Sequence, residues 1–122
     1  NRTKNYDGIQ QEITGRVHPK LAYKVIAIVR ISGGNSHITS ANVKATLWVY
    51  QQILWLQWLC SAQATIHDWV QLQGTFILNS CPKRVIIYLE GPDPGTDILL
   101  DSLVVNLAPK SLQSPPFIEV VQ

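Results

Sequence analysis

A chain of 122 residues has room for one domain with a single two-layer core. With 46% hydrophobic and 15% charged residues, its composition favours a folded globule over a disordered chain. The formal net charge is +2, and the lysine and arginine residues are scattered without a basic stripe, so we expect neither a nucleic-acid nor a membrane surface.

The first half of the chain alternates between apolar and polar residues in the manner of β-strands. Ile9 to Ile13 is a short alternating stretch that begins just after one glycine and ends near another. Leu21 to Ile31 is rich in β-branched residues, which favours a central strand covered on both faces for part of its length. A flexible loop over residues 32–36 follows, and the alternation resumes from Ala41 to Tyr50.

The middle of the chain contains one ambiguous segment. The apolar residues of Gln51 to Ala62 fit a buried strand as well as a helical stripe. We predict a strand because the neighbouring segments are strands. Trp69 to Leu78 alternates clearly and is predicted to be the next strand, with a turn at Asn79 to Pro82.

Arg84 to Val105 organises the second half of the chain as strand, rigid turn and strand. In the first strand, alternation puts one set of residues in the core and leaves Tyr88 and Glu90 side by side on the other face. The turn over residues 91–95 has two prolines that fix φ and two glycines that permit positive φ. The sequence therefore predicts a β-hairpin across this turn.

This series of short strands, with frequent turn signals and no convincing amphipathic helix, predicts an all-β fold, an antiparallel β-sandwich. After Leu107 the segment APKSLQSPP is rich in proline and small polar residues. We therefore expect the sandwich domain to occupy residues 1–108 and a proline-containing linker to occupy residues 109–122.

Residue types that support catalysis do not gather in the sequence. Cys60 and Cys81 lack the spacing of a zinc site and are too few for a disulfide scaffold, so we expect two unpaired buried thiols. No nucleophile–base motif is evident, and we expect that the chain itself is not an enzyme. A catalytic carboxylate pair of Glu12 and Glu90 is a third-ranked hypothesis, because the sequence does not give their separation.

Aromatic residues on the polar faces of strands favour sugar binding. A sugar ring presents an apolar C–H face and hydroxyls, so its site needs flat aromatic side chains together with planar acceptors and donors. Tyr88 and Glu90 form such a pair, and Trp48, Tyr50 or Trp58 would extend it if their strands are neighbours. The alternative is that Tyr88 covers the sheet and Glu90 is a solvated surface charge.

Several stretches of the chain together resemble a known family. They are NYDGIQQEITGRV, LAYKVIAIVRI, VKATLWV, DWVQLQGTF and YLEGPDPGTDILLDSLVV. Over roughly residues 6–105 the chain is similar to the family 22 carbohydrate-binding modules that precede the catalytic domain in plant family 10 endo-1,4-β-xylanases. The resemblance implies a non-catalytic jelly-roll sandwich that holds xylan or xylo-oligosaccharides in a cleft on one sheet and carries a structural calcium.

The resemblance also implies roles for particular residues. The aromatic residue of the family's early strand falls on Tyr6, its cleft tyrosine and glutamate on Tyr88 and Glu90, and a cleft aromatic of the middle strand on Trp58. The acidic position of the last strand falls on Asp101, implied as a calcium ligand since calcium takes carboxylate oxygens. The alternative for Asp101 is a surface aspartate at a strand end.

The chain departs from the family pattern in ways that affect both the metal and the sugar site. Ile86 stands where the family has a further tyrosine, and residues 50–62 are more apolar than the family's segment and look shorter. The family has an earlier first strand with a cleft arginine and an acidic calcium ligand, and this strand is missing from the sequence. A sheet edge would then be exposed.

The resemblance therefore implies a secreted module that binds xylan in the extracellular plant cell wall and is attached to a family 10 xylanase domain. The alternative is a degenerate sandwich that has lost its ligand and serves as a spacer or a protein-contact domain, because a fold can outlast its site.

Overall fold

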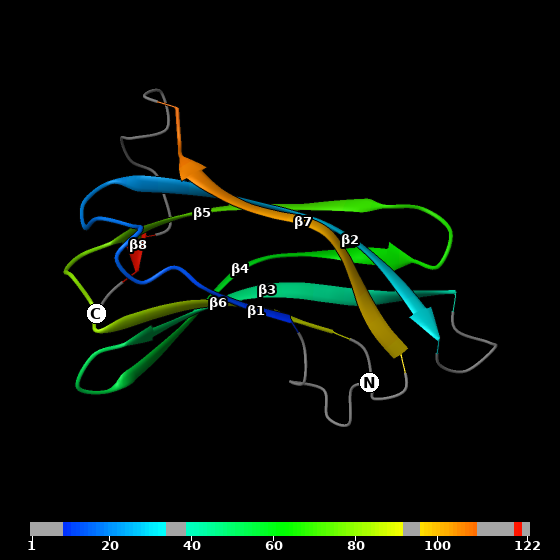
Figure 1. The fold of residues 1–122 in the computed structure, drawn as a ribbon, viewed down its shortest axis with the longest axis horizontal. Helices are drawn as coiled ribbons and strands as arrows, with labels where there is room; N and C mark the ends of the chain where they lie inside the picture. The colour runs from blue at the N-terminus through cyan, green and yellow to red at the C-terminus, as the bar shows by residue number, and fades with distance from the viewer. Residues whose placement is uncertain (1–8, 34–38, 92–95, 110–118, 121–122) are drawn as a thin grey trace.

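The computed structural model describes residues 9–33, 39–91, 96–109 and 119–120. The regular structure in these ranges consists of β-strands arranged in two layers (Figure 1). No helix that could cross a membrane occurs in the same ranges. The strands are β1 (Ile9–Glu12), β2 (Ala22–Gly33), β3 (Ser40–Tyr50), β4 (Leu54–Thr65), β5 (Val70–Leu78), β6 (Arg84–Glu90), β7 (Thr96–Leu107) and β8 (Glu119–Val120).

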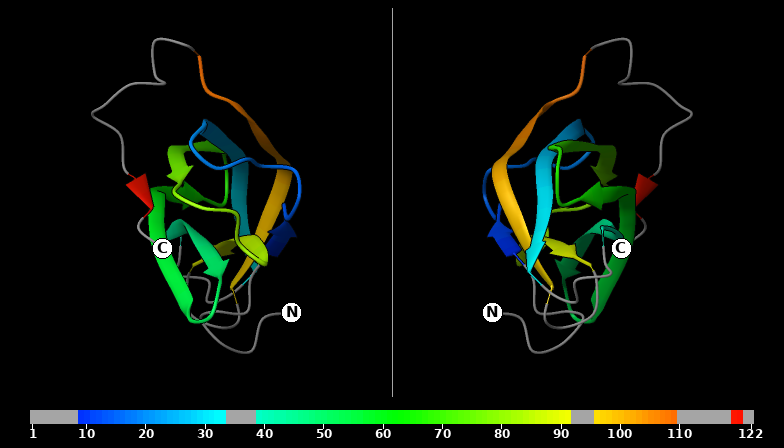
Figure 2. Two further views of the ribbon diagram at one scale, coloured as in Figure 1. Left: turned by 90° about the vertical axis from the view of Figure 1, so that its left-hand side faces the viewer. Right: turned by 90° about the vertical axis from the view of Figure 1, so that its right-hand side faces the viewer.

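Each layer is a four-stranded sheet. Sheet A has the strand order β1-β6-β3-β4, and all its neighbouring strands are antiparallel. Sheet B has the order β7-β2-β5-β8 and is antiparallel except for the short parallel pairing of β8 with β5. Viewed along the strands, the two sheets enclose a common interior (Figure 2). The predicted β-sandwich is therefore confirmed.

Alternate residues of the strands fill this interior. Every second residue from Tyr23 to Ile31 in β2, and from Val43 to Val49 in β3, is buried. The rings of Tyr23 and Phe76 stack across β2 and β5 with their centroids 5.7 Å apart. Because strand geometry turns the intervening residues the other way, each sheet also has an outer face with a different set of side chains.

β6 and β7 are strands as predicted, but they do not form a hairpin. β6 lies between β1 and β3 in sheet A, whereas β7 pairs with β2 in sheet B. The hairpin prediction was wrong because a short Gly- and Pro-rich connection also suits a chain that passes from one sheet of a sandwich to the other. The residues within a strand and its turn do not determine which other strand it pairs with.

The ambiguous middle segment is a strand, which confirms the prediction for it. β4 pairs with β3 from Tyr50↔Leu54 to Ser40↔Thr65, with a bulge where Ala45 faces Cys60 and Thr46 faces Trp58. The extra residue at the bulge is Leu59, so that Leu59 and Cys60 are both buried.

Cys60 and Cys81 are free thiols in different surroundings. Cys60 is buried in β4, and this burial raises the pKa of its thiol to about 11. Cys81 is exposed between β5 and β6. The expectation of two buried thiols is correct for Cys60 and wrong for Cys81, because Cys81 falls in a surface turn.

We expect Ellman's reagent to label one thiol in the folded chain at pH 8 and both thiols after unfolding. The thiolate is the reactive species, and Cys60 is shielded from the reagent and protonated at that pH. Cys81→Ser should remove the rapid labelling of the folded protein. Equal labelling rates for both thiols in the native state would contradict this expectation.

The boundary of the sandwich near Ala108 stays a prediction. Ala108 is buried, and its N–H donates a 2.9 Å hydrogen bond to the carbonyl of Ala22, so packing continues to this residue. Within the predicted linker, residues 110–118 lie outside the described residues, and Glu119–Val120 pair with the end of β5.

Candidate functional site

The outer face of sheet A carries rows of side chains that strand register brings together. Residues that are paired across antiparallel strands point to the same face. Tyr88 of β6 is paired with Gln10 of β1 and with Thr46 of β3, and Thr46 is paired with Trp58 of β4. Tyr88 and Trp58 therefore belong to the same face, with β3 between them.

The next row on this face adds Trp48, which is paired with Ile86 of β6 and with Leu56 of β4. Its ring centroid lies 4.3 Å from that of Tyr88 and 6.5 Å from that of Tyr50. The ring planes are tilted by 38° and 42° in these two pairs. Tyr88, Trp48 and Tyr50, here named the aromatic row, thus form a continuous and twisted aromatic surface.

Trp48 has an unsatisfied polar atom within this surface. Among the described residues, its indole Nε1 is buried and finds no hydrogen-bond acceptor. A buried donor without an acceptor costs about 1–3 kcal/mol. The N–H is covered by protein atoms, so the surface that Trp48 offers to a ligand is its ring and not this donor.

Tyr88 is a half-buried member of the row. Burial raises the pKa of its hydroxyl, and the neighbouring Tyr50 raises it further. The hydroxyl therefore stays protonated and serves as a neutral donor and acceptor at physiological pH.

Two ion pairs flank the aromatic row. Lys44 Nζ lies 3.6 Å from Glu90 Oε2, with the Glu90 side chain 14% exposed and that of Lys44 47% exposed. On the other side, Arg84 Nη2 lies 3.0 Å from Glu12 Oε1, and the Arg84 guanidinium lies 5.3 Å from the centre of the Tyr50 ring. Charged donors and acceptors that can bind hydroxyl groups thus stand at both ends of the rings.

The Arg84–Glu12 pair makes the titration of Glu12 a test of this geometry. The hydrogen bond from Arg84, and then that from the Thr14 hydroxyl, hold the pKa of Glu12 below its ordinary value of 4.5. A depressed folded-state pKa stabilises the fold above the unfolded-state pKa, and this contribution is lost as the pH falls through the folded-state value. We expect an NMR titration of the Glu12 carboxyl carbon to have its midpoint below 4.5, and Arg84→Gln to raise it. The same midpoint in both proteins would argue against the ion pair.

Three of the four residues predicted to bind sugar, namely Tyr88, Glu90 and Trp58, share the outer face of sheet A. Trp58 is 52% exposed, so it belongs to the surface and not to the core. Tyr6 lies outside the described residues. Contact of these side chains with a sugar stays a prediction.

Trp48 and Tyr50 are more central to this face than the sequence indicated. Alternation along β3 already placed both on a polar face, and that was the available signal. What the sequence lacked was the pairing of β3 with β6, which sets Trp48 against Tyr88.

The apolar middle segment widens this face and does not cover Tyr88. Leu54 and Leu56 of β4 are 43% and 58% exposed, and β3 separates β4 from β6. Ile86, which stands in the position of a family tyrosine, is buried on the outer face by its neighbours. It is paired with Trp48 of β3 on the same face.

Asp101 lies on the other sheet, exposed in β7 beside a bulge of the β2–β7 pairing. In the part of the chain that the structure describes, no three His, Cys, Asp or Glu side chains gather so that they could hold a metal. Calcium can also be held by backbone carbonyls and by fewer carboxylates. Calcium with Asp101 as a ligand therefore stays a prediction from the resemblance.

The hypothesis of a catalytic pair between Glu12 and Glu90 is wrong. Glu12 is paired with Ile86, which lies four residues before Glu90 on β6, and this sets the backbone positions of the two glutamates roughly 13 Å apart along the strand. Carboxylate pairs in glycoside hydrolysis are about 5–9.5 Å apart. Each carboxylate also has its own cation, Arg84 or Lys44.

A sandwich that presents exposed rings and paired charges on one sheet has the construction of a sugar-binding module. The model of the family described as "Carbohydrate binding domain" matches residues 1–96. The chain belongs to this family, and it is a binding module and not a catalytic domain.

The chain is similar to parts of two plant xylanases. It is 51% identical to Endo-1,4-beta-xylanase 1 and 50% identical to Endo-1,4-beta-xylanase 3 of Arabidopsis thaliana, in each case over 94% of its own length. It spans 12% and 15% of these two relatives, so it corresponds to a small part of each.

Solved structures share the fold. The CBM22-1 xylan-binding domain of Paenibacillus barcinonensis Xyn10C superposes with a TM-score of 0.76 at 23% identity, over 88% of this chain and 68% of that one. The C-terminal family 22 carbohydrate binding module of Clostridium thermocellum Xyn10B gives a TM-score of 0.75 at 18% identity, over 88% and 69%. The family and the sandwich fold expected from the resemblance are both confirmed.

Proposed function

We propose that the outer face of sheet A binds xylan or xylo-oligosaccharides. The observation that carries this proposal is the aromatic row, with Trp58 on the same face. Coplanar rings suit a flat crystalline surface, whereas rings tilted by 38° and 42° suit a single sugar chain that turns from one unit to the next. The xylanases among its relatives favour xylan as that chain.

Each side chain has a distinct role in this proposal. Tyr88 and Trp58 stack on sugar rings, as does Tyr6 by the resemblance. Glu90 accepts and Lys44 donates hydrogen bonds to hydroxyl groups, since their ion pair leaves lone pairs and N–H groups unused. Trp48 contributes its ring, which lies 4.3 Å from the ring of Tyr88.

The module also has a proposed role in a longer protein. Its plant relatives are named as endo-1,4-β-xylanases, of which it spans only a small part. We infer that the module is attached to a family 10 xylanase domain and holds that domain on xylan in the extracellular plant cell wall. Such tethering raises the local concentration of substrate at the catalytic domain.

Affinity gel electrophoresis in soluble xylan tests the binding proposal directly. The folded module should migrate more slowly in a gel that contains xylan than in one that lacks it. Bovine serum albumin in the same gels controls for viscosity. Equal mobility in the two gels would reject the proposal.

A spacer or protein-contact domain without sugar binding is the second candidate. The exposed Ile53, Leu54 and Leu56 favour it, because contiguous apolar patches often mark protein interfaces. Calorimetric titration with xylohexaose separates the two candidates. Micromolar binding rejects the spacer, and heat changes equal to those of dilution support it.

Calcium, with Asp101 as one ligand, is proposed from the resemblance. An ion that binds only the folded state raises its melting temperature. We expect EGTA to lower the melting temperature by several degrees and Asp101→Asn to reduce that effect. A melting temperature that EGTA leaves unchanged would contradict calcium binding by this chain.

A further inference from the structure

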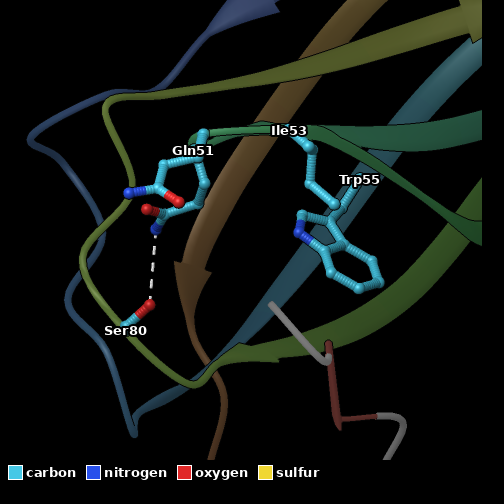
Figure 3. A pocket seen from close by; sticks show the side chains of 5 residues that line it. Gln51, Ile53, Trp55 and Ser80 are labelled. Atoms are coloured by element: carbon cyan, nitrogen blue, oxygen red, sulfur yellow. Dashed lines mark hydrogen bonds between the residues drawn. The ribbon is translucent and has the colours of Figure 1, made fainter.

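A hollow lies at one end of the sandwich, at the turn that follows Tyr50 of the aromatic row. It has a volume of about 330 Å³ and is lined by Gln51, Gln52, Ile53, Trp55 and Ser80. Gln51 and Ser80 lie on one side of the open space and the indole of Trp55 on the other (Figure 3). Here we name it the end pocket.

The end pocket is built from two turns that hydrogen bonds hold together. The turn after β3 is closed by the Gln51 N–H, which donates to the Ile53 carbonyl at 3.2 Å. Gln51 Nε2 donates to Ser80 Oγ at 3.3 Å, and the Lys83 N–H donates to the Tyr50 carbonyl at 2.9 Å. Both turns lie at the same end of the molecule (Figure 1), so the walls of the pocket are fixed relative to each other.

The end pocket faces away from the surface of the aromatic row. Trp55 is paired with Val49, whose side chain is in the core, and Trp55 itself packs against that core. Tyr50 and Leu54, the neighbouring pair, point instead to the outer face of sheet A. A sugar chain on the aromatic row would therefore not contact the Trp55 ring.

The lining defines the chemistry of a ligand. None of the five lining residues carries a charge, so a phosphate, a carboxylate or an ammonium group would find no counter-charge among them. The two carboxamides and the hydroxyl supply both donors and acceptors, while the indole supplies an apolar surface. A neutral ring with hydroxyl groups and one apolar C–H face matches this combination.

We propose that the end pocket binds one neutral sugar unit, independently of the aromatic row. Such a site is weak by itself, with a Kd on the order of 1 mM for a monosaccharide. On a polysaccharide it adds to the binding at the aromatic row, because two linked sites raise the effective concentration of each for the other.

The indole N–H signals of the four tryptophans offer a test in one NMR spectrum. Trp48 and Trp58 report on the outer face of sheet A, Trp69 on the side of sheet B, and Trp55 on the end pocket. The probes are xylose and glucose, each titrated to 50 mM, after assignment of the signals by single Trp→Phe variants. We expect saturable movement of the Trp55 signal with at least one of the two sugars.

Two double variants decide where the sugar binds. Gln51→Ala with Gln52→Ala should raise the sugar Kd measured from the Trp55 signal at least tenfold. The matched variant, Gln71→Ala with Gln73→Ala, removes two exposed amides on β5 and should leave this Kd unchanged. Tyr88→Ala with Glu90→Ala should also leave it unchanged.

Three outcomes would contradict the proposal that the end pocket binds a sugar. They are a Trp55 signal that neither sugar moves, a movement that the Tyr88 and Glu90 variant abolishes, and a movement that the Gln51 and Gln52 variant leaves intact. The response of Trp48 and Trp58 to xylohexaose in the same protein reports separately on the proposed function of the outer face.

Discussion

Replacing Tyr88 by alanine should lower the affinity of the chain for xylohexaose at least tenfold, a loss of about 1.4 kcal/mol or more. Tyr88 is the ring of the aromatic row on β6, and its removal takes away a stacking surface and its contact with Trp48 at 4.3 Å. Isothermal titration calorimetry measures the change. Glu90→Gln should also weaken binding, because it removes the negative charge that holds Lys44.

Trp69→Ala is the matched control for this experiment. Trp69 is a large aromatic residue that is 47% exposed, yet it lies against Arg30 of β2 in sheet B, with the guanidinium 5.0 Å from its ring. Its loss should leave the xylohexaose affinity within twofold. An unchanged affinity in a folded Tyr88→Ala protein would show that the aromatic row is not the site.

Replacing Gly74 by valine should destabilise the fold by about 2–3 kcal/mol. Gly74 of β5 faces the backbone of Leu59 in β4 of sheet A, and a Cβ atom there would stand 3.0 Å from the carbonyl oxygen of Leu59. That oxygen belongs to the backbone of the β4 bulge, so it cannot rotate away as a side chain would. For a domain of this size we expect the melting temperature, followed by circular dichroism, to fall by about 10 °C.

Thr75→Val is the neighbouring control. Thr75 is paired with Lys24, and both are half-buried on the outer face of sheet B, so a side chain of nearly equal size meets no backbone there. Its melting temperature should stay within about 2 °C of the parent. A Gly74→Val protein as stable as this control would mean that the two sheets are not in close contact at Leu59.

The candidate site was predictable in part because its signals are local. Alternation in β3 and β6 placed Trp48, Tyr50, Tyr88 and Glu90 on polar faces before any pairing was known. The position of Trp58 was not predictable in the same way, since the apolar segment around it is as typical of a core as of a surface. Trp58 is exposed because it lies on the outer face of an edge strand of sheet A.

The predictions that were wrong concerned contacts between strands, which the sequence near each strand does not determine. The turn after Glu90 was predicted to close a hairpin, yet its two strands belong to different sheets. Glu12 and Glu90 were considered as a pair, and the register of β1 on β6 sets them apart. In both cases the result depends on which distant strand provides the partner.

By itself, the sequence determined which side chains face the core in the strands that alternate clearly, such as β3 and β6, because the two-residue period of a strand is a property of neighbouring residues. Only the tertiary structure decided that Tyr88 meets Trp48 and that Lys44 meets Glu90. Those contacts depend on the order and register of strands that are far apart in the chain, and these are set by how both sheets close over one core.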